Sequence, residues 1–194
     1  MAGSCLPVKH DRQGNQLRII AGRWRGRKLA FAPVPGLRPT PDRVRETLFN
    51  WLGPVLPGAR CLDLFAGSGA LGIEAASRGA AEVVMVDNDP LVVRTLREQL
   101  QLLDFSAARV VQQDVKSWLA TSATAFDVVF LDPPFRQDRL PACIALLQEG
   151  GWLAADARIY MEAEKSLTPD LPDSWELYRS KCAGQVGYHL AIRA

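Results

Sequence analysis

The segment Arg60–Gly72 reads Arg-Cys-Leu-Asp-Leu-Phe-Ala-Gly-Ser-Gly-Ala-Leu-Gly, and it decides the fold. Its apolar first half indicates a buried strand over Arg60–Phe65, and a helix is expected over Ala70–Arg78. Between them, Gly67, Gly69 and Gly72 fulfil the spacing G-x-G-x-x-G. Such glycines allow a tight turn that brings the backbone close to a ligand at the helix N-terminus. The segment therefore predicts a ligand-binding loop in an α/β fold.

Strand and helix patterns continue to alternate after this segment. Further strands are expected over Glu82–Asp87, Arg109–Gln113, Phe126–Asp132 and Arg158–Glu162, with helical segments over Pro90–Leu103, Val115–Ala120 and Leu140–Gln148 between them. The tail indicates a hairpin of Trp175–Cys182 and Val186–Arg193. This series predicts a Rossmann-like, doubly wound sheet that is mostly parallel and has an antiparallel hairpin at its C-terminal edge.

The residues before this series predict a small N-terminal β-hairpin. Its strands are expected at Leu17–Ala21 and Arg27–Phe31, with the turn at Gly22–Gly26. A helix is expected to begin at Thr40-Pro41-Asp42, where the Thr40 hydroxyl would be the N-cap. We therefore expect a tail and basic hairpin over residues 1–36, followed by one α/β domain over residues 37–194.

Composition narrows the class of protein. The chain has 194 residues, 48% of them apolar, which supports a sizeable core. Its four cysteines are far apart and form no Cys-x-x-Cys pair, which argues against a structural zinc site or a disulfide framework. Neither a signal peptide nor a stretch long enough to span a membrane is apparent. A cytoplasmic protein is therefore expected, with no membrane contact and no metal.

Charge is distributed unevenly along the chain. Residues 1–60 hold 11 Lys/Arg and 3 Asp/Glu, whereas residues 61–194 hold 12 and 18. A basic segment over residues 1–60, followed by an acidic remainder, favours contact between the basic segment and a polyanion such as RNA. In the hairpin, Arg23, Arg25, Arg27 and Lys28 alternate around Trp24, which suits phosphate contact and base stacking.

Acidic residues at predicted strand ends indicate an adenosine-bearing cofactor. Asp87 ends the second strand of the series, where an acid can accept hydrogen bonds from ribose hydroxyls. Asp63 precedes the glycine loop, where a carboxylate would repel a pyrophosphate but hold the amino group of an amino-acid-like ligand. S-adenosylmethionine has that amine and no phosphates. Asp114 either accepts from the adenine amino group, with Val115 packed on the ring, or caps the following helix.

The second chemical motif is Asp132-Pro133-Pro134-Phe135, which follows an apolar strand. Two prolines cannot continue a central strand, so the chain must turn there. The Asp132 carboxylate and the Pro133 carbonyl can each accept one hydrogen of an exocyclic –NH₂, and Phe135 can stack on the base. Holding both hydrogens would aim the nitrogen lone pair at a methyl donor, so catalysis would act mainly by positioning.

Together these motifs resemble the class I S-adenosylmethionine-dependent amino-methyltransferases. The stretches Arg18–Leu29, Gly36–Thr40 and Asp42–Leu52, with Ala183–Val186, are similar to the ribosomal RNA small subunit methyltransferase D family. The resemblance covers roughly residues 17–193. It implies methylation of the N2 amine of one guanine of 16S rRNA, at position 966 in the usual rRNA numbering, on the small ribosomal subunit or an assembly intermediate, by a monomer.

The resemblance also implies a set of site residues. Asp132, Pro133, Pro134 and Phe135 would hold the guanine. The expected cofactor contacts are Asp63, Phe65, Gly67, Gly69, Asp87, Asn88, Asp114, Val115 and Thr40. The expected RNA contacts are Arg23, Trp24, Arg25, Arg27, Lys28, Arg38 and Arg43, of which Arg43 is equally well explained as a solvated position on its helix.

Three other functions are left open by the motifs. An adenine-N6 methyltransferase would use the same Asp-Pro-Pro-Phe turn, because adenine also presents an exocyclic amine and a flat ring. A nicotinamide oxidoreductase is supported by the glycine spacing alone. A non-catalytic RNA-binding assembly factor would keep the fold and the basic segment without needing Asp132.

Overall fold

The computed structural model describes residues 15–134 and 139–194. Over these ranges the elements are, in chain order, β1 (Gln16–Arg18), β2 (Lys28–Ala30), α1 (Asp42–Leu52), β3 (Arg60–Asp63), α2 (Ala70–Ser77), β4 (Glu82–Asp87), α3 (Pro90–Leu103), β5 (Ala108–Gln112), α4 (Val115–Leu119), β6 (Phe126–Leu131), α5 (Arg139–Glu149), β7 (Leu153–Glu164), β8 (Trp175–Ala183) and β9 (Val186–Arg193). None of the helices in the described part of the chain combines the length and apolarity needed to cross a membrane.

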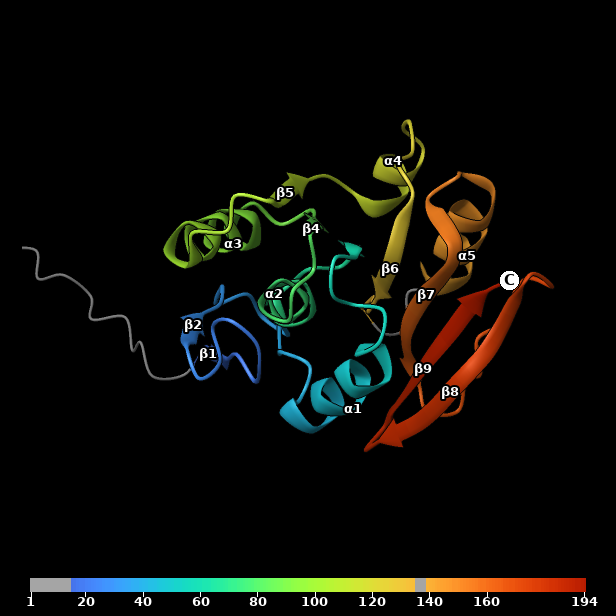
Figure 1. Ribbon diagram of the computed structural model, residues 1–194, viewed down its shortest axis with the longest axis horizontal. Helices are drawn as coiled ribbons and strands as arrows, with labels where there is room; N and C mark the ends of the chain where they lie inside the picture. The colour runs from blue at the N-terminus through green and yellow to red at the C-terminus, as the bar shows by residue number, and fades with distance from the viewer. Residues whose placement is uncertain (1–14, 135–138) are drawn as a thin grey trace, which may run out of the picture.

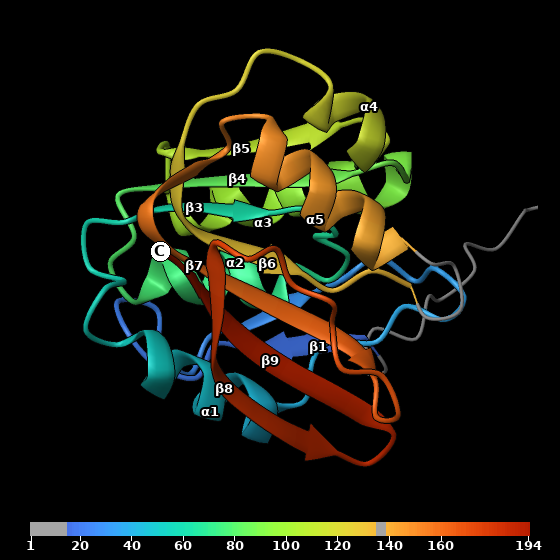
Figure 2. The ribbon, with the colours of Figure 1, turned by 90° about the vertical axis from the view of Figure 1, so that its right-hand side faces the viewer.

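A seven-stranded sheet with the order β5-β4-β3-β6-β7-β9-β8 forms the centre of the molecule (Figure 2). The five strands from β5 to β7 pair in parallel, and β9 runs antiparallel to both β7 and β8. The predicted fold class is therefore confirmed, including the antiparallel hairpin at the C-terminal edge.

Helices cover both faces of this sheet (Figure 1). On one face α1, α2 and α3 pack on alternate strand residues, in a core that includes Leu48, Ile73, Leu96, Met85 and Phe130. On the other face α4 and α5 pack on the intervening residues, in a second core that includes Trp118, Ile144, Leu62, Val129 and Ile159. Strands buried on both faces explain why the sequence shows near-continuous apolar runs there.

The direction in which successive strands are added to the sheet reverses at β3. From β3 the chain proceeds outward through β4 and β5, and then returns to place β6 on the other side of β3, with Asp63 paired to Phe130. Parallel strands that diverge in this way leave a crevice at their carboxyl ends, where α/β proteins bind ligands. The chain residues that follow β3, β4 and β6 therefore converge on one site.

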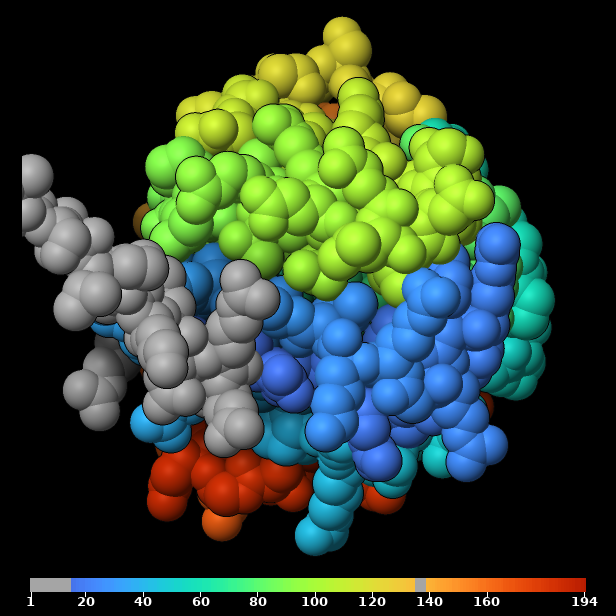
Figure 3. Space-filling model, turned by 90° about the vertical axis from the view of Figure 1, so that its left-hand side faces the viewer, coloured from blue at the N-terminus to red at the C-terminus, as the bar shows by residue number. Residues whose placement is uncertain are grey.

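The N-terminal hairpin is present but shorter than expected. Its strands pair antiparallel as β1 and β2, with Leu17 opposite Leu29. Ile19, Trp24 and Leu29 belong to the same apolar core as α1, α2 and α3. Figure 3 shows this blue N-terminal segment lying directly against the green surface of α3, which β2 contacts. The division at residue 36 stays a prediction, but the described part of the hairpin shares its core with the sheet.

Some predicted boundaries were wrong. Helix α1 begins at Asp42, with Pro41 at the N-cap position and no side-chain cap, so the Thr40 hydroxyl does not cap this helix. Strand β3 ends at Asp63 rather than Phe65, since the chain turns into the glycine loop there. Strand β7 spans Leu153–Glu164 and extends beyond the predicted Arg158–Glu162 at both ends.

Candidate active site

Asp63 lies at the carboxyl end of β3, beneath the glycine loop. Its side chain is buried, and Oδ2 accepts a hydrogen bond from the Gly72 N–H at 3.0 Å. Within the described residues, Asp63 Oδ1 is buried and has no hydrogen-bond partner. Buried polar atoms are almost always paired, so an unpaired carboxylate oxygen marks a place for an external donor.

The electrostatics of Asp63 support the same conclusion. Burial raises the pKa of this carboxyl to about 7. The Gly72 N–H lowers it, the negative charge of Asp87 raises it further, and a weaker contact with the Phe65 N–H lowers it slightly. A buried carboxylate gains most from a partner that carries positive charge. The ammonium group of an amino-acid-like ligand would satisfy both the unpaired oxygen and the unfavourable charge.

The glycine loop is shaped by residues that leave no room for a side chain. Gly67 and Gly69 have positive φ values of 48° and 78°. A Cβ at Gly67 would lie 2.9 Å from Leu37 Cδ1, and one at Gly72 would lie 2.8 Å from Met85 and 3.2 Å from Asp63 Oδ2. These glycines therefore let Leu37 pack against the loop and let α2 approach β4 closely. Phe65, also expected at the cofactor, is half-buried and packs against the second core.

Asp87 supports the glycine loop from the end of β4. Its Oδ2 accepts from the Gly67 N–H at 2.9 Å, and its Oδ1 accepts from the Asp89 N–H at 2.9 Å. Each carboxylate oxygen can accept more than one hydrogen bond, so Asp87 retains capacity for ribose hydroxyls. Asn88 is exposed beside it.

Asp114 caps a helix, which was one of its two predicted roles. Its Oδ1 accepts from the N–H groups of Lys116 and Ser117 at 3.0 and 3.2 Å, and Arg139 lies 3.6 Å from Oδ2. Val115 is buried in the second core. Contact of either residue with adenine stays a prediction.

The Asp-Pro-Pro turn follows β6, directly beside β3. Burial raises the pKa of Asp132 well above its ordinary value, and the charges of Glu162 and Asp63 raise it further. Pro133 is buried and Pro134 is exposed, so the turn has one face toward the protein and one toward solvent. Phe135 lies outside the described residues, and its role as a stacking ring stays a prediction.

Sequence reasoning missed two residues next to Asp132. Glu162 and Tyr160 are buried on β7, and the Tyr160 hydroxyl donates to Glu162 Oε1 at 2.7 Å. Thr40 is also buried here, and its hydroxyl can donate its single hydrogen to the carboxyl of either Asp132 or Glu162. One signal was available, because Glu162 is a charged residue in the otherwise apolar run Ile159–Ala163, at the end of a strand.

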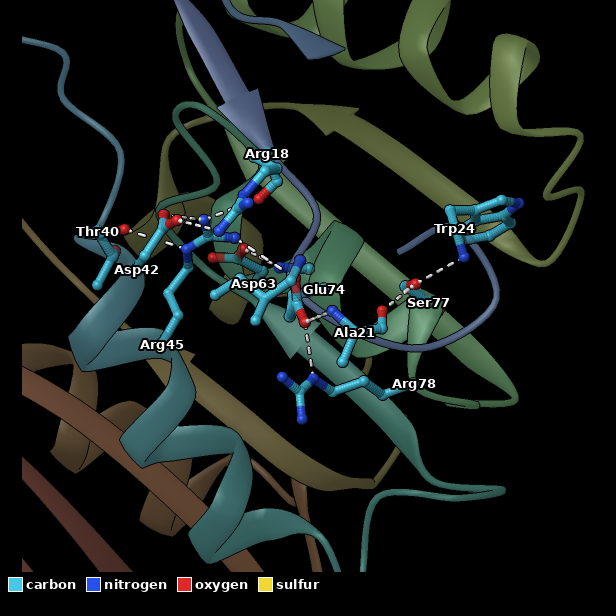
Figure 4. Close-up of polar contacts among 12 residues, drawn as sticks. Arg18, Ala21, Trp24, Thr40, Asp42, Arg45, Asp63, Glu74, Ser77 and Arg78 are labelled. Atoms are coloured by element: carbon cyan, nitrogen blue, oxygen red, sulfur yellow. Dashed lines mark hydrogen bonds and ion pairs between the residues drawn. The ribbon is translucent and has the colours of Figure 1, made fainter. Parts of the chain in front are cut away.

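A buried polar network joins the hairpin to this site (Figure 4). Glu74 on α2 accepts from the N–H groups of Ile20 and Ala21, at 2.9 and 3.0 Å, and pairs with Arg45 and Arg78. Arg45 is itself buried and donates to three further oxygens: the Thr40 carbonyl at 3.1 Å, the Arg18 carbonyl at 2.9 Å and Asp42 Oδ1 at 2.7 Å.

The structure divides the predicted RNA contacts into two groups. Trp24 is only 6% exposed, and its ring packs edge-on against Phe105 at a centroid distance of 5.6 Å. This burial contradicts base stacking by Trp24, whose ring instead anchors the hairpin. The predicted basic contacts are all exposed, although Arg27 also donates to the Leu102 carbonyl at 3.3 Å: Arg23, Arg25, Arg27, Lys28, Arg38 and Arg43.

Comparison with known proteins identifies the relatives of this chain. The family pattern described as "Conserved hypothetical protein 95" matches residues 17–192. Ribosomal RNA small subunit methyltransferase D of Escherichia coli K12 is 53% identical over 92% of this chain and 90% of its own length, and that of Haemophilus influenzae is 47% identical over 90% and 93%. The solved structure of Escherichia coli yhhF is 54% identical, with a TM-score of 0.85 over 92% of this chain and 98% of that one.

A more distant structure extends the likeness in fold. The 16S rRNA N2 methyltransferase of Thermus thermophilus, solved with AdoMet and guanosine, has a TM-score of 0.67 at 23% identity and covers 92% of this chain and 50% of that one.

The sheet order, the acidic residues at the ends of β3 and β4 and the Asp-Pro-Pro turn after β6 define a Rossmann-like methyltransferase. The identity over nearly the whole chain goes further: this protein belongs to the ribosomal RNA small subunit methyltransferase D family, whose members methylate rRNA.

Proposed function

We propose that this chain transfers a methyl group from S-adenosylmethionine to the exocyclic N2 of a guanine of 16S rRNA, at position 966 in the usual rRNA numbering. It would act as a monomer in the cytoplasm, on the small ribosomal subunit or an assembly intermediate. The observation that carries the proposal is the pair of acids at the switch point, where the unpaired Asp63 Oδ1 lies near the Asp132 turn.

The residues present fit the cofactor. Asp63 Oδ1 would accept from its ammonium group, Asp87 from its ribose hydroxyls and Asp114 from its adenine amine, with Val115, Phe65, Asn88 and Thr40 around it. Gly67 and Gly69 would keep the loop in the tight turn that brings its backbone toward the cofactor. When bound, S-adenosylmethionine supplies a methyl group on a positively charged sulfur.

The Asp132 turn would hold the nucleophile. The Asp132 carboxylate and the Pro133 carbonyl accept the two hydrogens of the guanine N2, which orients the nitrogen lone pair outward from the turn. Negative charge at Asp132 also stabilises the positive charge that develops on the nitrogen. The nitrogen would take up the methyl group, the sulfur would keep the electron pair of its former bond to carbon, and the extra proton on the nitrogen would pass to solvent.

The exposed basic residues would supply RNA affinity. Arg23, Arg25, Arg27 and Lys28 lie on the described hairpin, and Arg38 and Arg43 flank Thr40. Contacts to phosphates carry little sequence information. The choice of one guanine would therefore come from the folded context of the ribosomal subunit.

The experiment replaces Asp132, the residue proposed to bind the target amine, and measures methyl transfer and cofactor binding separately. We expect Asp132→Ala to lower methyl transfer to small subunits from an unmethylated strain by about 10²-fold or more, while calorimetry shows unchanged binding of S-adenosylhomocysteine. Equal loss of both properties would contradict the assigned role, and retained methylation would favour an assembly factor. Mass mapping of the rRNA identifies the modified base, so a methylated adenine would select the adenine-N6 alternative, and tight NAD binding would select an oxidoreductase.

A further inference from the structure

A cluster of four side chains, three of them buried and Asp132 half-buried, lies at the Asp132 turn. It comprises Thr40 before α1, Asp132 after β6, and Tyr160 and Glu162 on β7. Glu162 is only 6% exposed, and Tyr160 is fully buried. A carboxylate in such a place needs donors. Glu162 accepts from the Tyr160 hydroxyl, and the Thr40 hydroxyl can also donate to it.

Strand register fixes Glu162 beside Asp132. Strands β6 and β7 pair in parallel, with Leu131 opposite Met161. Asp132 and Glu162 are the next residues along each chain, so they are neighbours across two adjacent strands, whose spacing is about 4.8 Å. The Thr40 hydroxyl is close to both carboxyls and can donate its single hydrogen to either one.

We propose that Glu162 is a further positioning residue of this enzyme. Glu162 acts through Thr40 and through its own charge, and it holds the Asp132 carboxyl in the orientation and protonation state that methyl transfer requires. This inference rests on the proposed function, because it concerns the group that would hold the target amine. It adds a third acid to the site, one that does not itself face the substrate.

The charges around Asp132 explain why Glu162 matters. The groups that face Asp132 are Asp63 from β3, Glu162 and Tyr160 from β7, and Thr40 from the segment before α1, while Tyr188 from β9 acts on Tyr160. Burial and the negative charge of Glu162 both make ionisation of Asp132 less favourable, and the Thr40 hydrogen bond opposes them. Two adjacent carboxyls beside one hydroxyl do not both ionise at the same pH. The Tyr160 hydroxyl donates to Glu162 and favours its ionised form, so Asp132 is the member that retains a proton to higher pH.

Two substitutions are expected to change the pH profile in opposite directions. Glu162→Gln keeps the shape and an acceptor for the Tyr160 hydroxyl but removes the charge, so Asp132 ionises at lower pH. We expect the acid limb of the kcat profile to move down by about one pH unit or more. Thr40→Val removes the hydroxyl that favours the Asp132 carboxylate, so the limb is expected to move up and kcat to fall. Thr40→Ser restores the hydroxyl and should recover most of both effects.

The profile is measured at saturating S-adenosylmethionine with unmethylated small subunits, and circular dichroism confirms that each variant is folded. Glu176→Gln, an exposed position on β8, is the matched control and should leave the profile unchanged. Superimposable limbs for wild type, Glu162→Gln and Thr40→Val, or limbs that move in the same direction, would overturn the inference. An inactive wild-type protein, by contrast, would refute the proposed function itself.

Discussion

Gly72 shows how much one residue of the glycine loop determines. Its N–H is the donor that holds Asp63 Oδ2, and its missing side chain lets α2 lie against Met85 of β4. The spacing of the three glycines predicted close approach of the backbone to a ligand, and the structure adds a second role for Gly72, because only glycine fits where α2 and β4 meet so tightly. The third glycine thus sets both packing and the position of the acid.

Replacing Gly72 by alanine is expected to cost about 1–3 kcal/mol of unfolding free energy. The new methyl group would lie 2.8 Å from Met85 and 3.2 Å from Asp63 Oδ2, so both must move. Urea unfolding measures the stability, and calorimetry should show weaker binding of S-adenosylhomocysteine. Gly53→Ala is the control, since its added Cβ meets only ordinary contacts at 3.6 Å; a similar loss there would show that the Gly72 effect is not local.

Individual residues also mark where sequence reasoning reached its limit. Asp63, Asp87 and Asp132 could be placed because each follows a recognisable strand, and parallel strands end at one edge. The roles of Glu162 and Thr40 could not, because their contact depends on the register of β7 against β6 and on how the chain enters α1. Side chains that come into contact only through tertiary packing produce no recognisable spacing pattern in the sequence.

At the scale of elements, the N-terminal hairpin is the part whose interpretation changed most. Its basic residues suggested a surface arm, and its tryptophan suggested a stacking platform. The structure instead places Trp24 in the core and bonds the hairpin backbone to Glu74, 54 residues from Ile20 in the sequence. The basic side chains therefore project from a firmly attached element.

Neutralising this element is expected to weaken substrate binding in a salt-dependent way. Removal of one phosphate contact should reduce the slope of log affinity against log salt by about 0.7–0.9. The double variant Arg23→Ala/Arg25→Ala is measured against small subunits over a range of salt concentrations. Arg109→Ala/Arg158→Ala, which removes two basic residues of β5 and β7, should bind like wild type. Identical slopes for all three proteins would argue against phosphate binding by the hairpin.

For the whole molecule, the buried acids make stability depend on pH. Burial raises the pKa of Asp63 from its ordinary 3.8 to about 7, and the pKa values of Asp132 and Glu162 are also raised. A group whose folded pKa is raised binds protons more tightly in the folded state. Its stabilising contribution is complete below the unfolded pKa and is lost as pH rises through the folded value. The ligand-free protein is therefore destabilised by its own site near neutral pH.

We expect the Asp63→Asn variant to gain stability relative to wild type as pH rises from about 4 to about 8, by an amount on the order of 4 kcal/mol. Asp132 contributes to this difference as well, because the negative charge of Asp63 helps to raise its pKa. Urea unfolding of both proteins across that range is the measurement. Parallel stability curves would show that Asp63 titrates normally. In wild type, S-adenosylhomocysteine should stabilise most at the upper end of the range, where Asp63 is ionised.

The attachment of the hairpin has a consequence for how this protein can diversify. Glu74 and Ser77 hold the loop through main-chain groups of Ile20, Ala21, Arg23 and Trp24 rather than through their side chains. A mutation that changes an exposed side chain of the loop leaves those bonds intact. Substitutions on the outward face of the hairpin can therefore change which RNA it binds without weakening its attachment to α2. RNA recognition can thus evolve independently of the fold that supports it.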